Sequence, residues 1–236
     1  MQTLILGDCF DYMADMPSGS VDVILTDPPY NLSGYSTGNM DFSWRKTINN
    51  NIATWDKDFD PILLLEPFQR ILRENGTIFA FTSYNLLGKW HQAFDPEFDT
   101  FQFFVWHKTN PPIKIRRAGF LNSCELIVCI WNQGHHWNFG KQNEMHNFFQ
   151  SGICQGKERI GHPTQKPLSI LNQLMKYVVK PGAVVFDPYM GVGSSGEAAL
   201  LAGCDFIGVE IDPLYYALAK DRLAKYLDNE IQNVVS

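Results

Sequence analysis

The sequence predicts an α/β fold with a doubly wound, mostly parallel sheet of about seven strands and helices on both faces. Two observations support this prediction. Most apolar runs are continuous, as expected for strands buried on both faces, and helical patterns fall between most of them. The strand patterns lie near residues 3–7, 21–26, 77–82, 101–107, 125–131, 183–187 and 205–210.

Four helical patterns separate or follow these strands. The first covers residues 61–74, with Pro61 near its first turn and Gly76 just past its end, positions that proline and glycine favour. The others cover residues 167–179, 194–202 and 213–227. A chain of 236 residues has room for one domain of this kind, which we expect to span residues 1–236.

The composition excludes several classes of protein. The chain has no apolar run of about 18 residues, so we expect no membrane span. Its first residues are typical of a strand rather than of a signal peptide. The five cysteines are scattered and form no Cys-x-x-Cys pair, and the histidines show no metal-ligand spacing. These features favour a cytoplasmic protein with reduced thiols and no metal site.

Charge is unevenly distributed along the chain. The net charge is −6, yet residues 101–170 carry eight Lys and Arg against three Glu, a net charge of +5. This segregation predicts a polyanion-binding face on an acidic body, with solvated loops as the alternative. The candidate DNA contacts are Lys108, Lys114, Arg116, Arg117 and Lys141.

Long stretches between the predicted elements are polar but rich in aromatic residues. Residues 31–56 contain Asn, Ser and Gly together with Tyr, Phe and Trp, and residues 108–123 and 132–162 are basic with His, Trp and Phe interspersed. Loops of this length are usually functional or disordered, and the aromatic residues argue against disorder. We therefore expect residues 31–56 to contact the substrate.

The first motif is Asp27-Pro28-Pro29-Tyr30, directly after the strand pattern at 21–26. The carboxyl end of a strand is where open α/β sheets bind ligands. The prolines lack N–H donors, so carbonyl acceptors face outward, and Tyr30 offers a flat face for stacking on a base. Acceptors beside a stacking ring suit a planar group that bears an amine, although a simple strand-ending turn has similar residues.

The second motif follows the strand pattern at 183–187. Gly191-x-Gly193-x-x-Gly196 opens a helix, and Glu210 ends the next strand, a spacing that also fits a nicotinamide dehydrogenase. Two features favour another cofactor. The carboxylate of Asp187 would repel a pyrophosphate but could bind a cationic amino-acid group. The chain also ends 26 residues after Glu210, so the other strands of this sheet must come from the N-terminal part. Both motifs would then face one site.

Together the two motifs resemble those of the amino-methyltransferases of DNA. The order, with the catalytic motif first and the cofactor motif last, is similar to their permuted beta group. Gly7-Asp8-Cys9 near the N-terminus and the segment from His162 to Pro167 resemble further parts of that family. The resemblance covers nearly the whole chain and implies a Rossmann-like, S-adenosylmethionine-dependent methyltransferase fold.

The resemblance also implies the chemistry and its residues. An exocyclic amine attacks the methyl group of S-adenosylmethionine after the base is flipped out of the duplex. The implied catalytic residues are Asp27, Pro28, Pro29 and Tyr30. The implied cofactor-binding residues are Asp8, Cys9, Asp27, Thr164, Lys166, Asp187, Pro188, Gly191, Gly193, Ser194, Glu210 and Ile211. Residues 132–161 correspond to a short target-recognition segment.

The substrate implied by the resemblance is adenine in DNA, methylated on N6, because relatives that act on cytosine N4 more often carry Ser in place of Asp27. A cytosine-N4 methyltransferase is the first alternative. A nucleic-acid-binding subunit without catalysis and an NAD-dependent dehydrogenase are the others. The implied partner is DNA, with no membrane, and a homodimer and a cognate restriction nuclease are left open.

Overall fold

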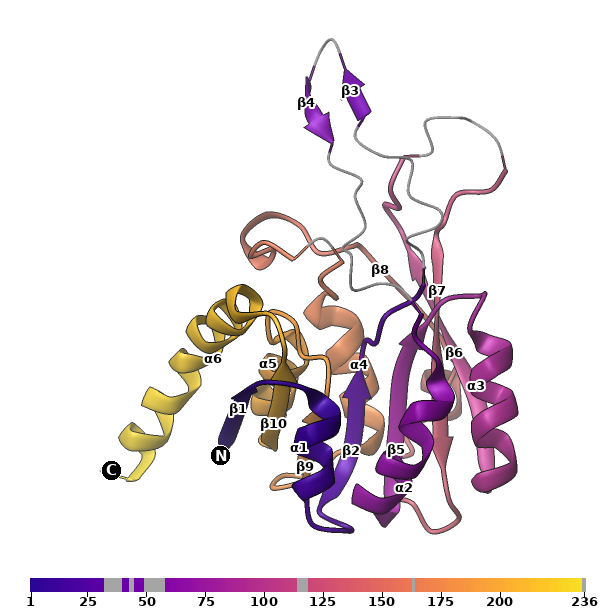
Figure 1. Ribbon diagram of the computed structural model, residues 1–236, viewed down its shortest axis with the longest axis vertical. Coiled ribbons are helices and arrows are strands. Elements are labelled where there is room, and N and C mark those ends of the chain that lie inside the picture. Colours follow the sequence, from indigo (N-terminus) through magenta and orange to yellow (C-terminus); the bar gives the residue numbers. More distant parts are fainter. Residues whose placement is uncertain (32–39, 43–44, 49–57, 114–118, 163, 235–236) are drawn as a thin grey trace.

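The computed structural model describes residues 1–31, 40–42, 45–48, 58–113, 119–162 and 164–234; for residues 40–42, 45–48 and 227–234 it describes only the backbone. Its main feature is a sheet of eight strands in the order β1-β10-β9-β2-β5-β7-β6-β8 (Figure 1). The strands are β1 (Gln2–Leu6), β2 (Val21–Thr26), β5 (Leu72–Thr82), β6 (Thr100–Lys108), β7 (Cys124–Trp131), β8 (Phe148–Ser151), β9 (Val184–Asp187) and β10 (Asp205–Glu210).

All neighbouring strands of this sheet pair in parallel except those that involve β7, which is antiparallel to both β5 and β6. The predicted α/β class and mostly parallel sheet are therefore confirmed. The seven expected strands all form. The eighth, β8, has only four residues and was not predicted, since so short a segment carries too few residues to show a clear alternation.

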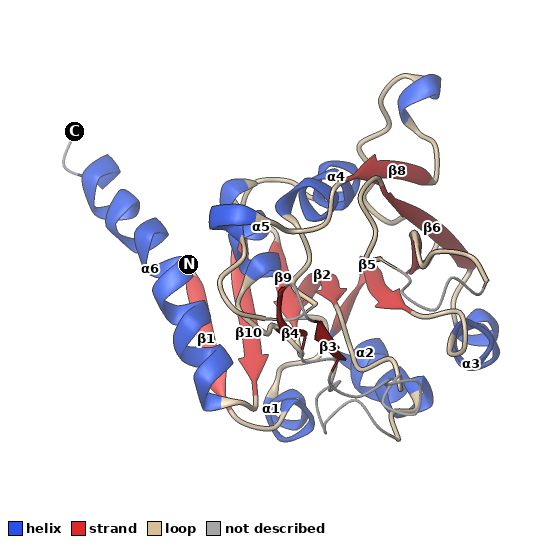
Figure 2. Cartoon of the chain, turned by 90° about the horizontal axis from the view of Figure 1, so that it is seen from above, coloured by secondary structure: helices blue, strands red, loops and turns tan. Residues whose placement is uncertain are grey.

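Helices cover both faces of the sheet, as Figure 2 shows from above. One face carries α4 (Leu168–Val178), α5 (Ser194–Leu201) and α6 (Pro213–Val234). The other carries α1 (Cys9–Asp15), α2 (Leu65–Ile71) and α3 (Leu87–Phe94). The described residues also form the 3-10 turns η2 (Pro61–Leu64), η3 (Asp95–Glu97), η4 (Gln142–Glu144) and η5 (Gly156–Glu158).

Alternate residues of the central strands enter two separate cores. On β2, Val23 and Leu25 pack beneath α4 to α6, whereas Ile24 packs beneath α1 to α3. All three side chains are fully or almost fully buried. Burial of one such side chain contributes roughly 1.5–3 kcal/mol, which explains why the strand sequence is continuously apolar.

The helices differ from the prediction in two places. The helix expected over residues 61–74 begins as η2 and ends at Ile71, because Leu72 starts β5 and pairs with Val21. The helices α1 and α3 were not predicted, since their seven and eight residues are fewer than a periodicity window needs. Within the segment 31–56, the structure describes a hairpin of β3 (Met40–Phe42) and β4 (Arg45–Ile48).

The topology brings both sequence motifs to one edge of the sheet. The strand β2 pairs in parallel with β9, and Ile24 lies beside Phe186. Asp27, directly after β2, and Asp187, the last residue of β9, therefore lie at the ends of neighbouring strands. β10 lies on the other side of β9 and ends at Glu210. The carboxyl ends of parallel strands meet at the same edge, which is where such sheets bind ligands.

Candidate active site

Asp27 is held by a lysine from a distant part of the chain. Nζ of Lys166, two residues before α4 begins, lies 2.5 Å from Oδ2 of Asp27. The Tyr30 hydroxyl donates to Oδ1 of the same carboxylate at 2.5 Å. The Lys166 side chain is only 6% exposed and its ammonium also lies 5.2 Å from the centre of the Tyr30 ring and 5.0 Å from that of Phe81. Both Asp27 oxygens are thus fixed.

A second carboxylate extends this cluster. Oε2 of Glu125 lies 3.4 Å from Nζ of Lys166, and Oε1 lies 2.5 Å from Nζ of Lys108. Because β7 is antiparallel, Glu125 near its start lies at the same edge as Lys108 at the end of β6. Two ammonium groups and two carboxylates therefore balance in a buried environment, where an uncompensated charge would be costly.

Burial and charge together set the protonation of this cluster. Burial raises the pKa of Asp27 more than the Lys166 ammonium lowers it, so its net pKa is raised. For Glu125, burial acts in the same sense, but Lys166 and Lys108 outweigh it and hold the pKa below its usual range. Burial alone would lower the pKa of Lys166, yet the two carboxylates raise it. Lys166 and Glu125 are therefore both charged at neutral pH.

The turn around Tyr30 is held by side chains on both sides. The Tyr30 carbonyl accepts hydrogen bonds from Ser83 Oγ at 3.3 Å and Asn85 Nδ2 at 3.1 Å. Asn31, in the left-handed region with φ 57°, bonds both backbone polar groups of Phe59, at 2.7 and 2.8 Å. Its amide therefore joins the two ends of the 32–58 segment. The sequence suggested a role only for the Tyr30 ring, whereas the structure also engages its hydroxyl.

The glycine loop connects β9 to α5 as the sequence motif indicates. Gly193 caps α5 with φ 77°, which residues with a side chain rarely adopt. A Cβ at Gly196 would lie 2.6 Å from the Phe206 ring, so glycine allows α5 to pack closely on β10. Asp187 before the loop is buried and accepts from Ser195 Oγ at 2.5 Å and from the Tyr189 N–H at 3.0 Å. Burial raises its pKa to about 7.

Glu210 lies across the loop from Asp187. Its Oε2 accepts from the Gly191 N–H at 2.9 Å and its Oε1 accepts from the Asp212 N–H at 2.8 Å. Burial raises the pKa of Glu210, although these N–H groups oppose the shift. A carboxylate has about four lone-pair positions, so both oxygens retain acceptor capacity toward a pair of hydroxyl groups.

The other residues expected at the cofactor differ in their exposure. Asp8 is exposed and caps α1 by accepting from the Phe10 N–H at 2.7 Å. Cys9 is buried, and burial raises the pKa of its thiol to about 11. The remaining four divide by exposure: Pro188 and Ser194 are buried, whereas Thr164 and Ile211 are exposed.

The candidate DNA contacts divide into three groups. Lys108 is 11% exposed and paired with Glu125, so its ammonium faces the charged cluster. Lys141 is exposed. Lys114, Arg116 and Arg117 lie outside the described residues.

Two features of the site were not found from the sequence. Glu125 is one, because the direction of β7, which places it beside Lys166, depends on tertiary pairing. The other feature is the ion pair of the buried Glu197 with Arg222. The Arg222 guanidinium also donates a hydrogen bond to Ser194 Oγ at 3.1 Å. The sequence signal for this ion pair is weak: Glu197 follows Ser194 by three residues, in the first turn of α5.

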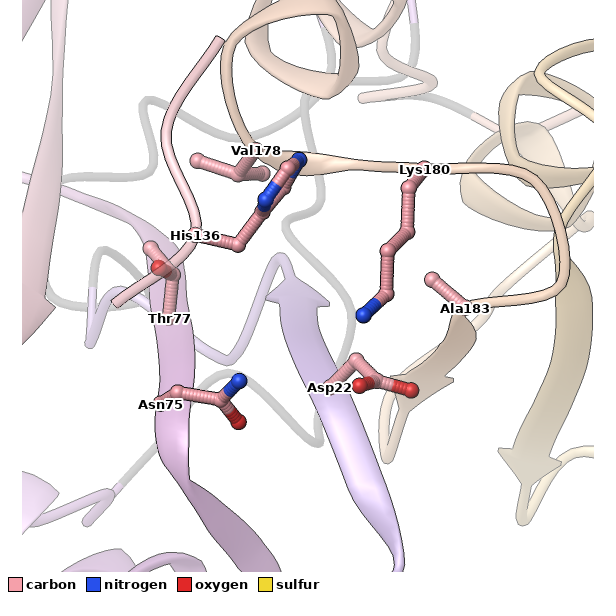
Figure 3. Close-up of a pocket in the computed structure, with 7 residues that line it drawn as sticks. All are labelled: Asp22, Asn75, Thr77, His136, Val178, Lys180 and Ala183. Carbon is pink, nitrogen blue, oxygen red and sulfur yellow. The ribbon is translucent and has the colours of Figure 1, made fainter. Parts of the chain in front are cut away.

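A small cavity lies at the opposite edge of the sheet, near the starts of β2, β5 and β9 (Figure 3). It holds about one water molecule and is lined by Asp22, Asn75, Thr77, His136, Val178, Lys180 and Ala183. It is therefore separate from Asp27. In the part of the chain that the structure describes, no group of three His, Cys, Asp or Glu side chains is arranged to hold a metal ion. None of the described helices has the length and hydropathy of a membrane span.

The chain is similar to known proteins in sequence and in fold. The family model for DNA methylases of the N6/N4 type matches residues 21–221. The type II methyltransferase M.HinfI of Haemophilus influenzae is 28% identical over 255 residues, which cover 97% of this chain and 70% of that protein.

Solved structures share the fold. The complex of M1.HpyAVI with SAM has a TM-score of 0.72 at 24% identity, and the match covers 94% of this chain and all of that one. PvuII DNA methyltransferase, described as cytosine-N4-specific, has a TM-score of 0.71 at 15% identity, covering 98% of this chain and 93% of that one. Both likenesses extend over nearly the whole described sheet.

Proposed function

Because the chain belongs to the family of N6/N4 DNA methylases, we propose that it transfers a methyl group from S-adenosylmethionine to the exocyclic N6 of adenine in DNA. The observation that carries the proposal is the position of Asp27. Its carboxylate ends β2 beside Tyr30, one strand from the Asp187 and Gly191 loop. An acceptor for an amine and a site for a cofactor therefore lie side by side.

The residues present fit S-adenosylmethionine. Glu210 offers carboxylate oxygens to a ribose hydroxyl pair and lies against the glycine loop, where it accepts a hydrogen bond from the Gly191 N–H. Asp187 is a buried carboxyl that can bind the ammonium of the methionine moiety. When bound, S-adenosylmethionine supplies an electrophilic methyl group on a sulfonium. The NAD-dependent alternative is disfavoured, because Asp187 would face a pyrophosphate.

The chain's own residues would act on the amine. Its lone pair is delocalised into the base, which makes the nitrogen a weak nucleophile. Asp27 and the Pro28 carbonyl can accept the amine protons and favour a tetrahedral nitrogen, while the Tyr30 ring stacks on the base. In the transfer, the amine lone pair would form the new N–C bond while the electrons of the methyl–sulfur bond return to the sulfonium sulfur, and Asp27 would accept the released amine proton and pass it to solvent.

The residue type of the acceptor favours adenine over cytosine in this proposal. Asp27 supplies a carboxyl group beside the Lys166 ammonium, whereas the cytosine-N4 relatives implied by the sequence resemblance more often carry Ser at this position. Cytosine N4 remains the second candidate, because PvuII DNA methyltransferase shares the fold.

The substrate base must leave the duplex before transfer. We propose that Lys141, Lys114, Arg116 and Arg117 contact phosphate, and that residues 31–56 and 132–161 take part in recognition. The free cysteines among the described residues fit the proposed cytoplasmic location.

The test uses DNA amplified in vitro, which carries no methylated adenine or cytosine. The protein is incubated with this DNA and tritiated S-adenosylmethionine, and the DNA is then digested to nucleosides for mass spectrometry. We expect label in N6-methyldeoxyadenosine. Label in N4-methyldeoxycytidine would support the second candidate, and binding of S-adenosylmethionine without any transfer would support the non-catalytic subunit.

A further inference from the structure

Glu125 contacts both groups that hold Asp27. Its Oε2 lies 3.4 Å from Nζ of Lys166 and 3.5 Å from the Tyr30 hydroxyl, and each of those groups lies 2.5 Å from an Asp27 oxygen. Its other oxygen is bound by Lys108 at 2.5 Å. The five side chains come from four places in the fold: β6, β7, the turn after β2 and the segment before α4.

We propose that Glu125 is a positioning residue for methyl transfer: it fixes Lys166 and the Tyr30 hydroxyl against Asp27, and Lys108 in turn fixes Glu125. This inference rests on the proposed function and adds residues to it. It also gives Lys108 a role other than contact with DNA phosphate.

The geometry favours positioning over simple burial of an ion pair. Nζ of Lys166 lies closer to Asp27 than to Glu125, so Glu125 sets the direction of the ammonium without displacing it from the catalytic carboxylate. The shared oxygen also restrains the Tyr30 ring, because its hydroxyl is held at the end of the aromatic side chain. A ring that is restrained in this way is prepared to stack on a base.

The charge of Glu125 acts on Asp27 in a defined direction. The charged or titratable groups with electrostatic influence at Asp27 are Lys166, Tyr30, Glu125 and Asp187. Glu125 raises the pKa of Asp27, since it disfavours a second negative charge nearby. Removing that charge should therefore lower the pKa of Asp27. A residue with only a packing role would leave this pKa unchanged.

The first test is Glu125→Gln, which keeps the shape and removes the charge. We expect kcat to fall by about 10²-fold through misplacement of the reacting groups, with the affinity for S-adenosylmethionine unchanged. The acidic limb of the kcat–pH profile should shift to lower pH. Glu125→Asp keeps the charge, so its acidic limb should stay closer to that of the wild-type protein. The control is Glu97→Gln, an exposed carboxylate that accepts from Gln69 Nε2 at 3.5 Å and should behave as wild type when its charge is removed.

The second test is Lys108→Gln. If Lys108 positions Glu125, kcat should fall while the slope of log DNA affinity against log salt stays unchanged. A slope smaller by about 0.9 with unchanged kcat would make Lys108 a phosphate contact and overturn its part of the proposal. Thermal unfolding of each variant establishes that it is folded.

A readout without turnover separates this inference from the proposed function. The titration of the Asp27 carboxyl carbon, followed by NMR and assigned with Asp27→Asn, should move to lower pH in Glu125→Gln. If this shift occurs but the wild-type protein methylates no DNA, the proposed function fails and the charge contact stands. If the wild-type protein is active and neither kcat, the acidic limb nor this titration changes in Glu125→Gln, the positioning role is overturned.

Discussion

Nζ of Lys166 lies 2.5 Å from Oδ2 of Asp27, a contact that joins residues 139 positions apart. It links the segment before α4 to the turn after β2, so the proposed cofactor side and the proposed substrate side of the site share one ion pair. The sequence resemblance implies that Lys166 binds the cofactor. The structure adds a direct contact with Asp27, from which the first prediction follows.

Lys166→Met should destabilise the protein and raise the pKa of Asp27. Removing one partner of a buried ion pair leaves charge uncompensated and costs about 3–5 kcal/mol in the free energy of unfolding. Without the ammonium, the acidic limb of the kcat–pH profile should shift to higher pH, opposite to the shift for Glu125→Gln. Denaturant unfolding and the pH profile measure both effects. Lys176→Met, at an exposed pair, is the control and should change neither.

The two parts of the Tyr30 side chain should contribute separately. Tyr30→Phe removes the hydroxyl that donates to Asp27, a hydrogen bond to a charged group worth about 1.5–3 kcal/mol. Tyr30→Ala also removes the ring, and loss of base stacking costs roughly 1–3 kcal/mol more. We therefore expect kcat/KM for DNA to fall in two steps. Wild-type activity in Tyr30→Phe would leave the ring as the only functional part.

Glu210→Ala should weaken binding of S-adenosylmethionine by about 1.5–3 kcal/mol, the value of a hydrogen bond to a charged group. The carboxylate also accepts from the N–H groups of Gly191 and Asp212, so its loss relaxes the loop as well. Calorimetry with S-adenosylmethionine measures the change. Glu210→Gln keeps one carbonyl acceptor, so its affinity for S-adenosylmethionine should lie between those of the wild-type protein and Glu210→Ala. Unchanged affinity in both variants would remove Glu210 from the site.

The sequence predicted the positions of Asp27 and Asp187 better than that of Glu125. Asp27 and Asp187 each follow an apolar strand, and parallel strands bring such residues to one edge without further information. Glu125 lies on a strand whose direction is set by its pairing with β5 and β6, which no local pattern determines. For the same reason, a charge count assigned Lys108 to DNA, since only the folded chain places a carboxylate against it.

The cluster around Glu197 provides a test of stability. This buried carboxylate pairs with Arg222, whose side chain is 5% exposed, and with the more exposed Lys225 at 2.5 Å. Glu197→Ala leaves the Arg222 charge buried without its partner, so we expect a loss of about 3–5 kcal/mol in the free energy of unfolding. Lys225→Ala removes only an exposed contact and should cost about 0–1 kcal/mol. Equal losses in the two variants would show that burial of Arg222 does not decide the effect.

Asp187 should make cofactor binding depend on pH. Its pKa is raised from 3.8 to about 7 by burial, so the unliganded protein holds a proton there below neutral pH. An ammonium of S-adenosylmethionine favours the ionised carboxylate, and binding must then release that proton. Affinity should therefore rise with pH, by up to about tenfold per unit below pH 7, and level off above it.

The raised pKa of Asp187 affects the stability of the unliganded protein in the opposite sense, because this stability falls as pH rises. Because the folded-state pKa of Asp187 lies above the unfolded value, its contribution to stability is fully present below about pH 4 and is lost as pH rises through about 7. Calorimetry in buffers of different ionisation enthalpy should detect the proton released on binding. Asp187→Asn should abolish both the release and the pH dependence, whereas Glu210→Gln should keep them. A wild-type affinity that is flat between about pH 5 and pH 8 would place the ammonium away from Asp187.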